Sequence, residues 1–172
     1  MKIMVIGYSG AGKSTLSKAL ANHYNIPLLY LDKIQFKEGW IDRDSSEALT
    51  MVEDFINNND SWIIDGNYHK RLYEERAELA DQIIYLNYNR FLCLARAIKR
   101  RFEYSSKTRE SITEGCKEKI DLSFVWWILY DGRRKQYKNK REEIKNKYKD
   151  KFLEFKNPKQ LDKYLRENNI QL

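Results

Sequence analysis

The sequence predicts an α/β domain in which a parallel sheet is covered by helices on both faces. Short apolar runs of strand length alternate along the chain with longer segments whose apolar residues recur at helical spacing. A glycine-rich segment, residues 7–14, stands between the first strand-like run and the first helical segment. Because parallel strands need helical crossovers, these two observations indicate one architecture.

The glycine-rich segment reads Gly-Tyr-Ser-Gly-Ala-Gly-Lys-Ser and fits the phosphate-binding pattern G-x-x-x-x-G-K-[ST]. Glycines let successive backbone N–H groups point at one anion, and the next helix adds the positive end of its dipole. Lys13 is expected at the β and γ phosphates of ATP, and the Ser14 hydroxyl on Mg²⁺. The residues expected to bind the nucleotide here are Gly7, Ser9, Gly10, Ala11, Gly12, Lys13, Ser14 and Thr15.

The sequence around this loop supports a binding role. Residues 2–6 form an apolar, β-branched run, and residues 14–24 follow as a helix with one apolar face. The alternative is a glycine turn that binds nothing. A strand before the loop and a helix after it argue against that alternative, because phosphate binding requires both.

The remaining elements follow in order. Further strands are expected at 28–31, 62–64, 82–86 and 152–155, the last weakly signalled, with a loop over 33–44. Helices are expected at 45–57, about 69–80, 90–102, about 133–149, and after the turn at 157–158. Asp44 or Ser45 can cap the helix at 45–57.

The apolar residues of the later part of the chain, from residue 90 to 130, change their pattern from one segment to the next. The apolar residues of the 90–102 helix, its expected core face, are Phe91, Leu94, Ala95 and Ile98. From residue 103 to about 119 the apolar period disappears, which predicts a functional loop or a lid, placed at about 101–120. Residues 121–130 regain apolar character, and core packing is the expected role rather than stacking on bases.

Composition sets the broad class. With 172 residues, 42% hydrophobic and 33% charged, the chain is expected to form a single globular domain over 1–172. No apolar run could span a bilayer and no signal peptide is recognised, so a cytoplasmic protein without membrane contact is expected. Cys93 and Cys116 form no C-x-x-C pair, which predicts free thiols rather than a zinc or redox site.

The net charge of +7 is uneven: residues 1–89 carry −4, residues 90–151 carry +10 and residues 152–172 carry +1. A basic section of this kind can contact nucleic acid or surround the phosphates of a bound nucleotide. The helix at 133–149 spreads its Lys and Arg residues around its circumference, so at most non-specific, salt-sensitive nucleic-acid binding is expected.

Asp65 ends a strand in Trp62-Ile63-Ile64-Asp65-Gly66. Strand ends in open parallel sheets face the ligand crevice, so Asp65 is expected to hold Mg²⁺ directly or through water, together with Ser14. The alternative is an ordinary turn aspartate before glycine.

Several of these features in order resemble a known group. The phosphate loop, the Ile-Ile-Asp-Gly strand end, the Arg96 and Arg100 pair, the polar insert and the later arginines resemble the nucleoside monophosphate kinase and shikimate kinase group of P-loop proteins. Within that group, Tyr30-Leu31-Asp32, Gly39-Trp40, residues 62–68 and the stretch around Phe91-Leu92-Cys93 resemble adenylate-kinase-related proteins often labelled DNA topology modulation proteins.

The resemblance covers nearly the whole chain and implies a three-layer P-loop NTPase fold with a five-stranded parallel sheet in the order 2-3-1-4-5. It also implies an acceptor-binding segment at about 33–59, after the second strand, and a mobile lid after the fourth. ATP and Mg²⁺ are the implied cofactors, and the implied partner is a small-molecule acceptor.

The resemblance also implies roles for individual residues. Asp32 matches an acid after the second strand that orients or deprotonates the acceptor, and Arg43 matches an arginine that grips it. Asp65-Gly66 matches the Asp-Gly after the third strand of adenylate kinases. A surface salt bridge is the open alternative for Arg43.

Further matches concern the nucleotide. Arg96 and Arg100 match spaced arginines before the lid, and Arg133 or Arg134 matches an arginine that contacts the transferring phosphate. Asn157 stands where an adenine-contacting loop is expected. For Arg96 and Arg100 the solvated face of a helix is the alternative.

The departures from the family patterns leave the acceptor open. The second acid of the shikimate kinase Asp-x-Asp is Ile34 here, and the Asp-Gly-Phe-Pro-Arg of adenylate kinases reads Asp-Gly-Asn-Tyr-His over 65–69, with Arg71 as a substitute arginine. An ATP-dependent kinase for a nucleotide or a small hydroxyl compound is the leading hypothesis. A nucleotide-dependent regulatory ATPase that binds DNA or RNA, and a nucleotide-binding protein that acts through partners, are the alternatives. Both a monomer and a homodimer are open.

Overall fold

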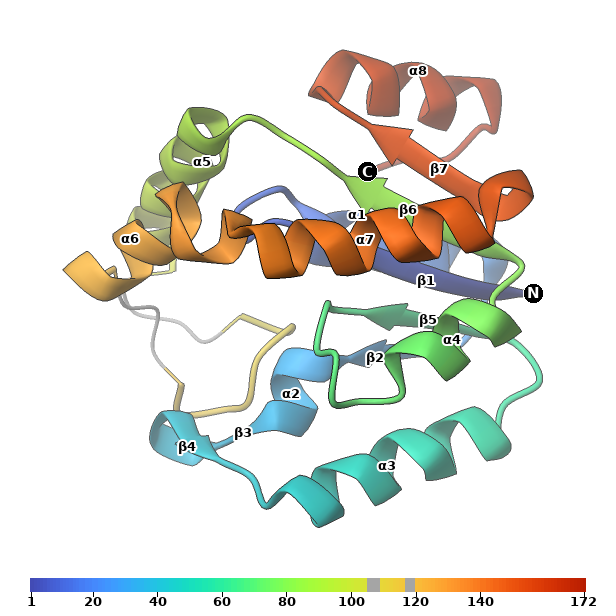
Figure 1. Ribbon diagram of the computed structural model, residues 1–172, viewed down its shortest axis with the longest axis horizontal. Coiled ribbons are helices and arrows are strands. Elements are labelled where there is room, and N and C mark those ends of the chain that lie inside the picture. Colours follow the sequence, from blue (N-terminus) through green and yellow to red (C-terminus); the bar gives the residue numbers. More distant parts are fainter. Residues whose placement is uncertain (105–108, 117–119) are drawn as a thin grey trace.

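The structure is a computed structural model, which describes residues 1–104, 109–116 and 120–172. Its centre is a five-stranded parallel sheet of β1 (Lys2–Gly7), β2 (Leu28–Tyr30), β5 (Trp62–Asp65), β6 (Gln82–Leu86) and β7 (Phe152–Phe155) (Figure 1). The spatial order is β2-β5-β1-β6-β7. Counted among these five strands alone, that order is 2-3-1-4-5, so the predicted topology is confirmed.

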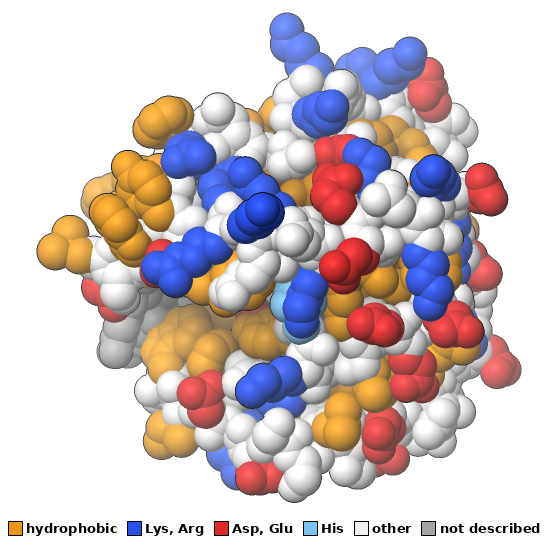
Figure 2. Space-filling view, viewed as in Figure 1, with side chains coloured by type: hydrophobic (Ala, Val, Ile, Leu, Met, Phe, Trp, Pro, Cys, Tyr) orange, Lys and Arg blue, Asp and Glu red, His pale blue; other side chains and the backbone are white. Residues whose placement is uncertain are grey.

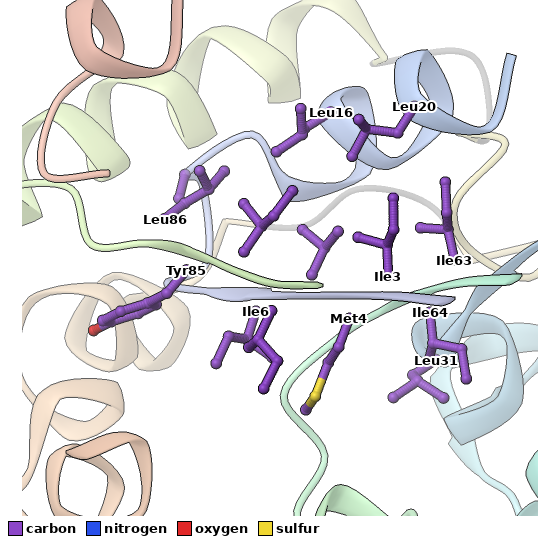
Figure 3. Packing of buried hydrophobic residues seen from close by; sticks show 14 of the residues in the cluster. Ile3, Met4, Ile6, Leu16, Leu20, Leu31, Ile63, Ile64, Tyr85 and Leu86 are labelled. Atoms are coloured by element: carbon purple, nitrogen blue, oxygen red, sulfur yellow. The ribbon is translucent and has the colours of Figure 1, made fainter. Parts of the chain in front are cut away.

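Helices cover both faces of the sheet and complete the three layers. The helices α1 (Lys13–Tyr24) and α8 (Pro158–Glu167) lie on one face, while α4 (Tyr73–Leu79) and α7 (Lys135–Lys147) lie on the other (Figure 1). Figure 3 shows the packing: Leu16 and Leu20 of α1 meet Ile3 of β1 above the sheet. Since side chains alternate along a strand, Met4 and Ile6 point to the opposite face (Figure 3).

The segment after β2 is more structured than the sequence predicted. Residues 33–44 were expected to form a loop, but the chain forms α2 (Leu31–Gln35), β3 (Phe36–Lys37), the 3₁₀ turn η1 (Glu38–Trp40) and β4 (Ile41–Asp42). β3 and β4 pair antiparallel in a small sheet of their own. Helix α3 (Ser45–Asn57) then begins as predicted, and the Asp44 carboxylate caps it by accepting from the N–H groups of Ser46 and Glu47.

Helix α5 (Arg90–Glu103) forms where predicted, but its predicted core face is largely wrong, since of its four residues only Leu94 packs against the core. Phe91 and Ile98 are exposed, whereas Cys93 and Ala97 are buried. The physical reason is close packing: a Cβ on Gly10 would lie 2.2 Å from the Cys93 carbonyl oxygen, so this face of α5 needs small side chains.

The core-packing prediction for residues 121–130 is also largely wrong. These residues form α6 (Leu122–Leu129), beside α5, and only Ile128 is buried there, while Leu122, Trp126, Trp127 and Tyr130 are exposed. The 3₁₀ turn η2 (Asp131–Arg133) joins α6 to α7, and η3 (Lys149–Lys151) joins α7 to β7.

Both cysteines are buried free thiols, as predicted. Within the described residues, none of the helices combines the length and apolarity needed to cross a membrane.

Candidate active site

A crevice of about 1960 Å³ opens at the carboxyl ends of the strands. Figure 2 shows it as a hollow with hydrophobic side chains on its walls and a histidine at its edge. The phosphate loop and the start of α1 line its middle. Its remaining walls come from α5, α8, the 31–45 segment, residues 66–71, α6 and α7.

The phosphate loop has the strained backbone that its glycines permit. Gly10 and Gly12 have φ values of 78° and 96°, a region that side-chain-bearing residues rarely adopt. The Lys13 ammonium donates to the Tyr8 carbonyl oxygen at 3.3 Å. Residues 9–15, which include Ser9, Ala11 and Thr15, all line the crevice.

A polar side chain missed by the sequence analysis holds the start of this loop. The Gly7 N–H donates to Asn67 Oδ1 at 3.0 Å, and Asn67 Nδ2 donates to the Gly7 carbonyl oxygen at 2.8 Å. Asn67 stands two residues after Asp65, but nothing in its local sequence distinguishes it from a turn residue. The two hydrogen bonds fix the loops after β1 and β5 to each other.

The carboxylate of Asp65 lies where a cation site was predicted. It is 5% exposed, and the Ser14 hydroxyl lies near enough to lower its pKa. Within the described residues its Oδ1 has no hydrogen-bond partner. Burial raises the pKa of Asp65 to about 6, against the opposing effects of Lys13 and Ser14. A buried carboxylate oxygen without a donor, beside a serine hydroxyl, fits a Mg²⁺ that takes its other ligands from phosphates and water.

Asp32 faces the crevice from a different element than expected. The strand β2 ends at Tyr30, and Asp32 lies in the first turn of α2 instead of at a strand end. The Tyr68 hydroxyl donates to Asp32 Oδ1 at 2.7 Å. Gly66 lies beside them, and its backbone (φ 136°) passes so close to Leu31 that a Cβ would approach the Leu31 side chain to 2.9 Å.

Two arginines line the crevice beside the 31–45 segment. Arg71 is 4% exposed and donates to Ser45 Oγ at 3.0 Å and to Gln35 Oε1 at 2.9 Å. Arg43 lies in this segment, where its Nε donates to the Ile34 carbonyl oxygen at 2.8 Å. Arg43 also forms a salt bridge with Glu47. Such a salt bridge was the alternative to its predicted role of gripping the acceptor, and the structure shows it on a residue that also lines the crevice.

A third arginine, Arg76, is wholly buried and was not singled out from the sequence. It donates to the carbonyl oxygens of Arg71, Gly66 and Tyr68, which shapes residues 66–71 into one wall of the crevice. Burial lowers the pKa of its guanidinium to about 10, so it remains charged at neutral pH.

Arg96 and Arg100 both line the crevice from α5. Arg96 donates to the Ala11 carbonyl oxygen at 3.1 Å and lies over the Tyr88 ring, so it braces the phosphate loop. The side chain of Asn157 caps α8 by accepting from the Gln160 N–H. Its neighbour Pro158 lines the crevice, whereas Asn157 does not.

The structure does not bring Arg133 or Arg134 into this crevice. The η2 turn directs Arg133 to the carbonyl oxygens of Ile128 and Tyr88, with its guanidinium 3.6 Å from the centre of the Tyr8 ring. Arg134 forms an exposed ion pair with Asp131. The arginine of this region that lines the crevice is Arg141 of α7, which is 4% exposed and donates to the Tyr8 hydroxyl at 3.2 Å. It stands seven positions after Arg134, and the sequence offered no signal for choosing it.

Residues 109–116 of the polar insert lie against the acceptor segment. The Thr113 hydroxyl donates to the Phe36 carbonyl oxygen, and the Trp40 N–H donates to the Cys116 sulfur at 3.3 Å. Glu110 pairs with Lys18 of α1. The described part of the insert therefore contacts both α1 and residues 36–40. Other parts of the predicted lid, residues 105–108 and 117–119, lie outside the described residues.

His69 lies at the crevice wall with its ring stacked against Tyr137, the centroids 6.1 Å apart. Burial, together with the charges of Lys140, Arg141 and Arg76, lowers the pKa of His69 to about 4. A histidine in this state is neutral at physiological pH. It can contribute an aromatic surface and a hydrogen bond but no positive charge.

Comparisons with known proteins bear on the fold. No protein-family model and no curated protein matches the chain. Among solved structures, TT1252 from Thermus thermophilus is similar with a TM-score of 0.53 and 14% identity, over 97% of each chain. Deoxyadenosine kinase from M. mycoides with bound dCTP gives 0.51 and 19%, over 98% of this chain and 99% of that one. The same enzyme with bound dATP gives 0.51 and 16%.

At these identities the likeness concerns the backbone arrangement, and the narrower resemblance to DNA topology modulation proteins rests on the sequence motifs. The chain therefore shares the backbone fold of these solved structures, with helices on both faces of a five-stranded parallel sheet and the glycine-rich loop after β1.

Proposed function

We propose that this protein is an ATP- and Mg²⁺-dependent kinase that transfers the γ-phosphoryl group of ATP to a hydroxyl of a small acceptor. The observation that carries the proposal is that the phosphate loop and the Asp32–Tyr68 pair line one crevice, with the carboxylate of Asp65 buried beside it, close enough to Lys13, Ser14 and Asp32 for each of them to shift its pKa. Phosphoryl transfer depends mainly on positioning and charge neutralisation, which such a crevice provides.

Each residue has a defined task in this reaction. Lys13 and the loop N–H groups bind the β and γ phosphates, and Ser14 and Asp65 hold Mg²⁺, which neutralises phosphate charge when bound. Asp32 orients the acceptor hydroxyl and accepts its proton. The bond between the γ phosphorus and its bridging oxygen breaks, a bond to the acceptor oxygen forms, and ADP leaves. Arg96, Arg100 and Arg141 add positive charge around the phosphates, and Arg109 adds more from the insert.

The walls of the crevice favour an acceptor with a flat ring. The aromatic residues that line the crevice are Tyr30, Phe36, Trp40, Tyr68, Tyr88, Tyr104, Phe124, Trp127 and Tyr137. Phe36 and Trp40 belong to the segment proposed to bind the acceptor, and Tyr68 donates to Asp32. Aromatic walls bind planar rings by stacking and edge contacts. A nucleoside, a nucleotide or another ring-bearing alcohol fits this crevice better than an open-chain sugar acid.

A phosphotransfer screen tests the proposal. The full-length protein with ATP and Mg²⁺ is incubated with nucleosides, nucleoside monophosphates, sugar acids and simple alcohols, and acceptor-dependent ADP release is measured. A ring-bearing hydroxyl compound should stimulate release, and Lys13→Ala should abolish the stimulation. Lys163→Ala, which removes an exposed lysine paired with Glu167, is the matched control and should behave like the wild type. ADP release that no acceptor stimulates would contradict the kinase assignment.

The second candidate is a nucleotide-dependent regulator that binds DNA or RNA. The exposed lysines of α7 favour it, and Figure 2 shows Lys and Arg side chains over this region. However, acidic side chains interrupt them, and Lys145 is paired with Glu154 at 2.7 Å. Nucleic-acid binding that persists at physiological salt and depends on ATP would favour this candidate over the kinase.

A further inference from the structure

An exposed apolar stripe runs along α5 on the side away from the crevice. Phe91 is 68% exposed, Ile98 41% and Phe102 76%. Residues at this spacing lie on one side of a helix. Arg96 points to the opposite side, where it contacts the phosphate loop. The stripe therefore belongs to the surface and has no role in holding α5 against the sheet.

Helix α6 continues this apolar surface. Leu122 is 88% exposed, Trp126 54% and Tyr130, directly after the helix, 49%. The two helices pack side by side, and the Arg90 guanidinium lies 5.6 Å from the Tyr130 ring centre, which places the end of α6 beside the start of α5. Figure 2 shows hydrophobic side chains gathered at the left edge, where Figure 1 places these helices. We call these six residues the α5–α6 face.

The size of the α5–α6 face is that of a protein interface. A large side chain exposes about 200 Å² when fully accessible. With the exposed fractions above, the six residues present roughly 700 Å² of mostly apolar surface. Monomeric proteins typically have largest apolar patches of about 300–600 Å². A standard interface buries about 800 Å² on each partner, so the face matches the contribution of one partner.

We propose that the α5–α6 face binds a second copy of this chain, so that the protein is a symmetric dimer with a four-helix interface. Two antiparallel helices present a two-helix layer, and a two-fold axis brings the same layer from the partner against it. The exposed area favours a second copy, because the face alone supplies about the area that each partner buries in a stable dimer.

The distribution of charge also suits a second copy. Helix α5 carries five basic residues and one acid, whereas residues 122–130 carry no charged side chain. If α6 of one copy covers α5 of the other, the two basic helices are kept apart and no charge is buried in the centre. Because Arg96 and Arg100 project from the far side of α5, dimer formation would brace one wall of each crevice without closing it.

Sedimentation velocity of the full chain between 5 and 100 µM tests the proposal. The wild type should sediment as a dimer, and Leu122→Glu and Phe102→Glu should both be monomeric at the same concentrations. Both positions are exposed, so the fold should be retained, as circular dichroism can verify. Ile41→Glu is the matched control, because Ile41 is 64% exposed but lies in β4, and this variant should remain dimeric.

Three outcomes would overturn the proposal. A monomeric wild type at 100 µM would show that the face does not bind a second copy. A dimer that persists in both variants would place the interface elsewhere. Binding of a monomeric wild type to vesicles of anionic phospholipid, lost in Leu122→Glu, would identify the face as a membrane contact instead. None of these outcomes depends on which acceptor the crevice takes.

Discussion

Asn67 and Gly7 are joined by two hydrogen bonds in which the side-chain amide of Asn67 satisfies both the N–H and the carbonyl of Gly7. The residues are 60 positions apart: Gly7 ends β1, and Asn67 follows the end of the adjacent strand β5 by two residues. This pair connects the loop expected to bind phosphate with the loop that carries Asp65. Its removal should therefore affect nucleotide binding as well as stability.

We expect Asn67→Ala to lower the free energy of unfolding by about 1–3 kcal/mol, since each buried hydrogen bond contributes about 0.5–1.5 kcal/mol. It should also weaken ATP binding, because the phosphate loop loses its anchor. Urea unfolding and calorimetry measure the two effects. Asn59→Ala removes one side-chain bond to the Phe55 carbonyl at the end of α3 and should lower stability without changing ATP affinity. Equal ATP affinity in both variants would show that the pair is purely structural.

Replacing Asp65 should stabilise the protein and inactivate it. Burial raises the pKa of Asp65 from 3.8 to about 6. Since each pKa unit corresponds to about 1.4 kcal/mol, the ionised carboxylate costs the apo fold about 3 kcal/mol at neutral pH. Asp65→Asn should remove this cost and, with it, the Mg²⁺ dependence of ATP binding.

The stability difference between Asp65→Asn and the wild type should depend on pH. Between about pH 4 and 6 the folded state binds more protons at Asp65 than the unfolded state, so this residue makes wild-type stability fall as pH rises. The advantage of Asp65→Asn should thus be largest above pH 6 and vanish near pH 4. Urea titrations without Mg²⁺ at pH 4.5 and 7.5 measure it. A variant that is less stable at pH 7.5 would indicate that the ionised carboxylate supports the fold.

Tyr68→Phe should reduce turnover while leaving ATP affinity unchanged. The variant keeps the ring but loses the 2.7 Å hydrogen bond that orients Asp32. We expect a fall of roughly tenfold, equivalent to about 1.4 kcal/mol of barrier, and a larger fall for Asp32→Asn. Tyr164→Phe, which loses a hydrogen bond to Gln82 far from the crevice, is the control and should keep wild-type turnover. Turnover of Asp32→Asn within threefold of the wild type would show that Asp32 does not act on the acceptor.

Ligand binding should protect the described part of the insert. Glu110 and Lys18 form an exposed ion pair, and exposed ion pairs contribute little to stability by themselves. Hydrogen bonds of Thr113 and Cys116 hold their end of the segment to residues 36–40, so the end around Glu110 should open first without ligand and close when phosphates engage Arg109. Hydrogen exchange of these amides, with and without an ATP analogue and acceptor, measures the change. Protection that is the same in both states would make this segment a fixed part of the wall.

The sheet could be predicted because its signals are local. The phosphate loop, the strands and the start of α3 each carry their pattern within a few residues, and the structure places them where the sequence indicated. The buried face of α5 could not be predicted in this way. Amphipathic periodicity indicated that Phe91 and Ile98 face the core, but the approach of Gly10 to the Cys93 backbone selects small side chains there.

The same limit applies to the site. Asp65 and the phosphate loop could be predicted because each stands at the end of a predicted strand. Asn67 and Arg76, in contrast, act on backbone groups that only the folded chain brings near them. Arg141 lines the crevice in place of Arg133 and Arg134 because the η2 turn directs Arg133 toward the Ile128 carbonyl before α7 begins. Sequence spacing alone contains no information on how that turn closes.

The small β3–β4 sheet stands outside the five-stranded sheet and shares no strand with it. Substitutions, insertions or deletions in the segment it belongs to can therefore alter the crevice wall that this segment forms without disturbing the strands that carry the phosphate loop. Over evolutionary time, a chain built this way can exchange one bound molecule for another while the loop after β1 is inherited unchanged.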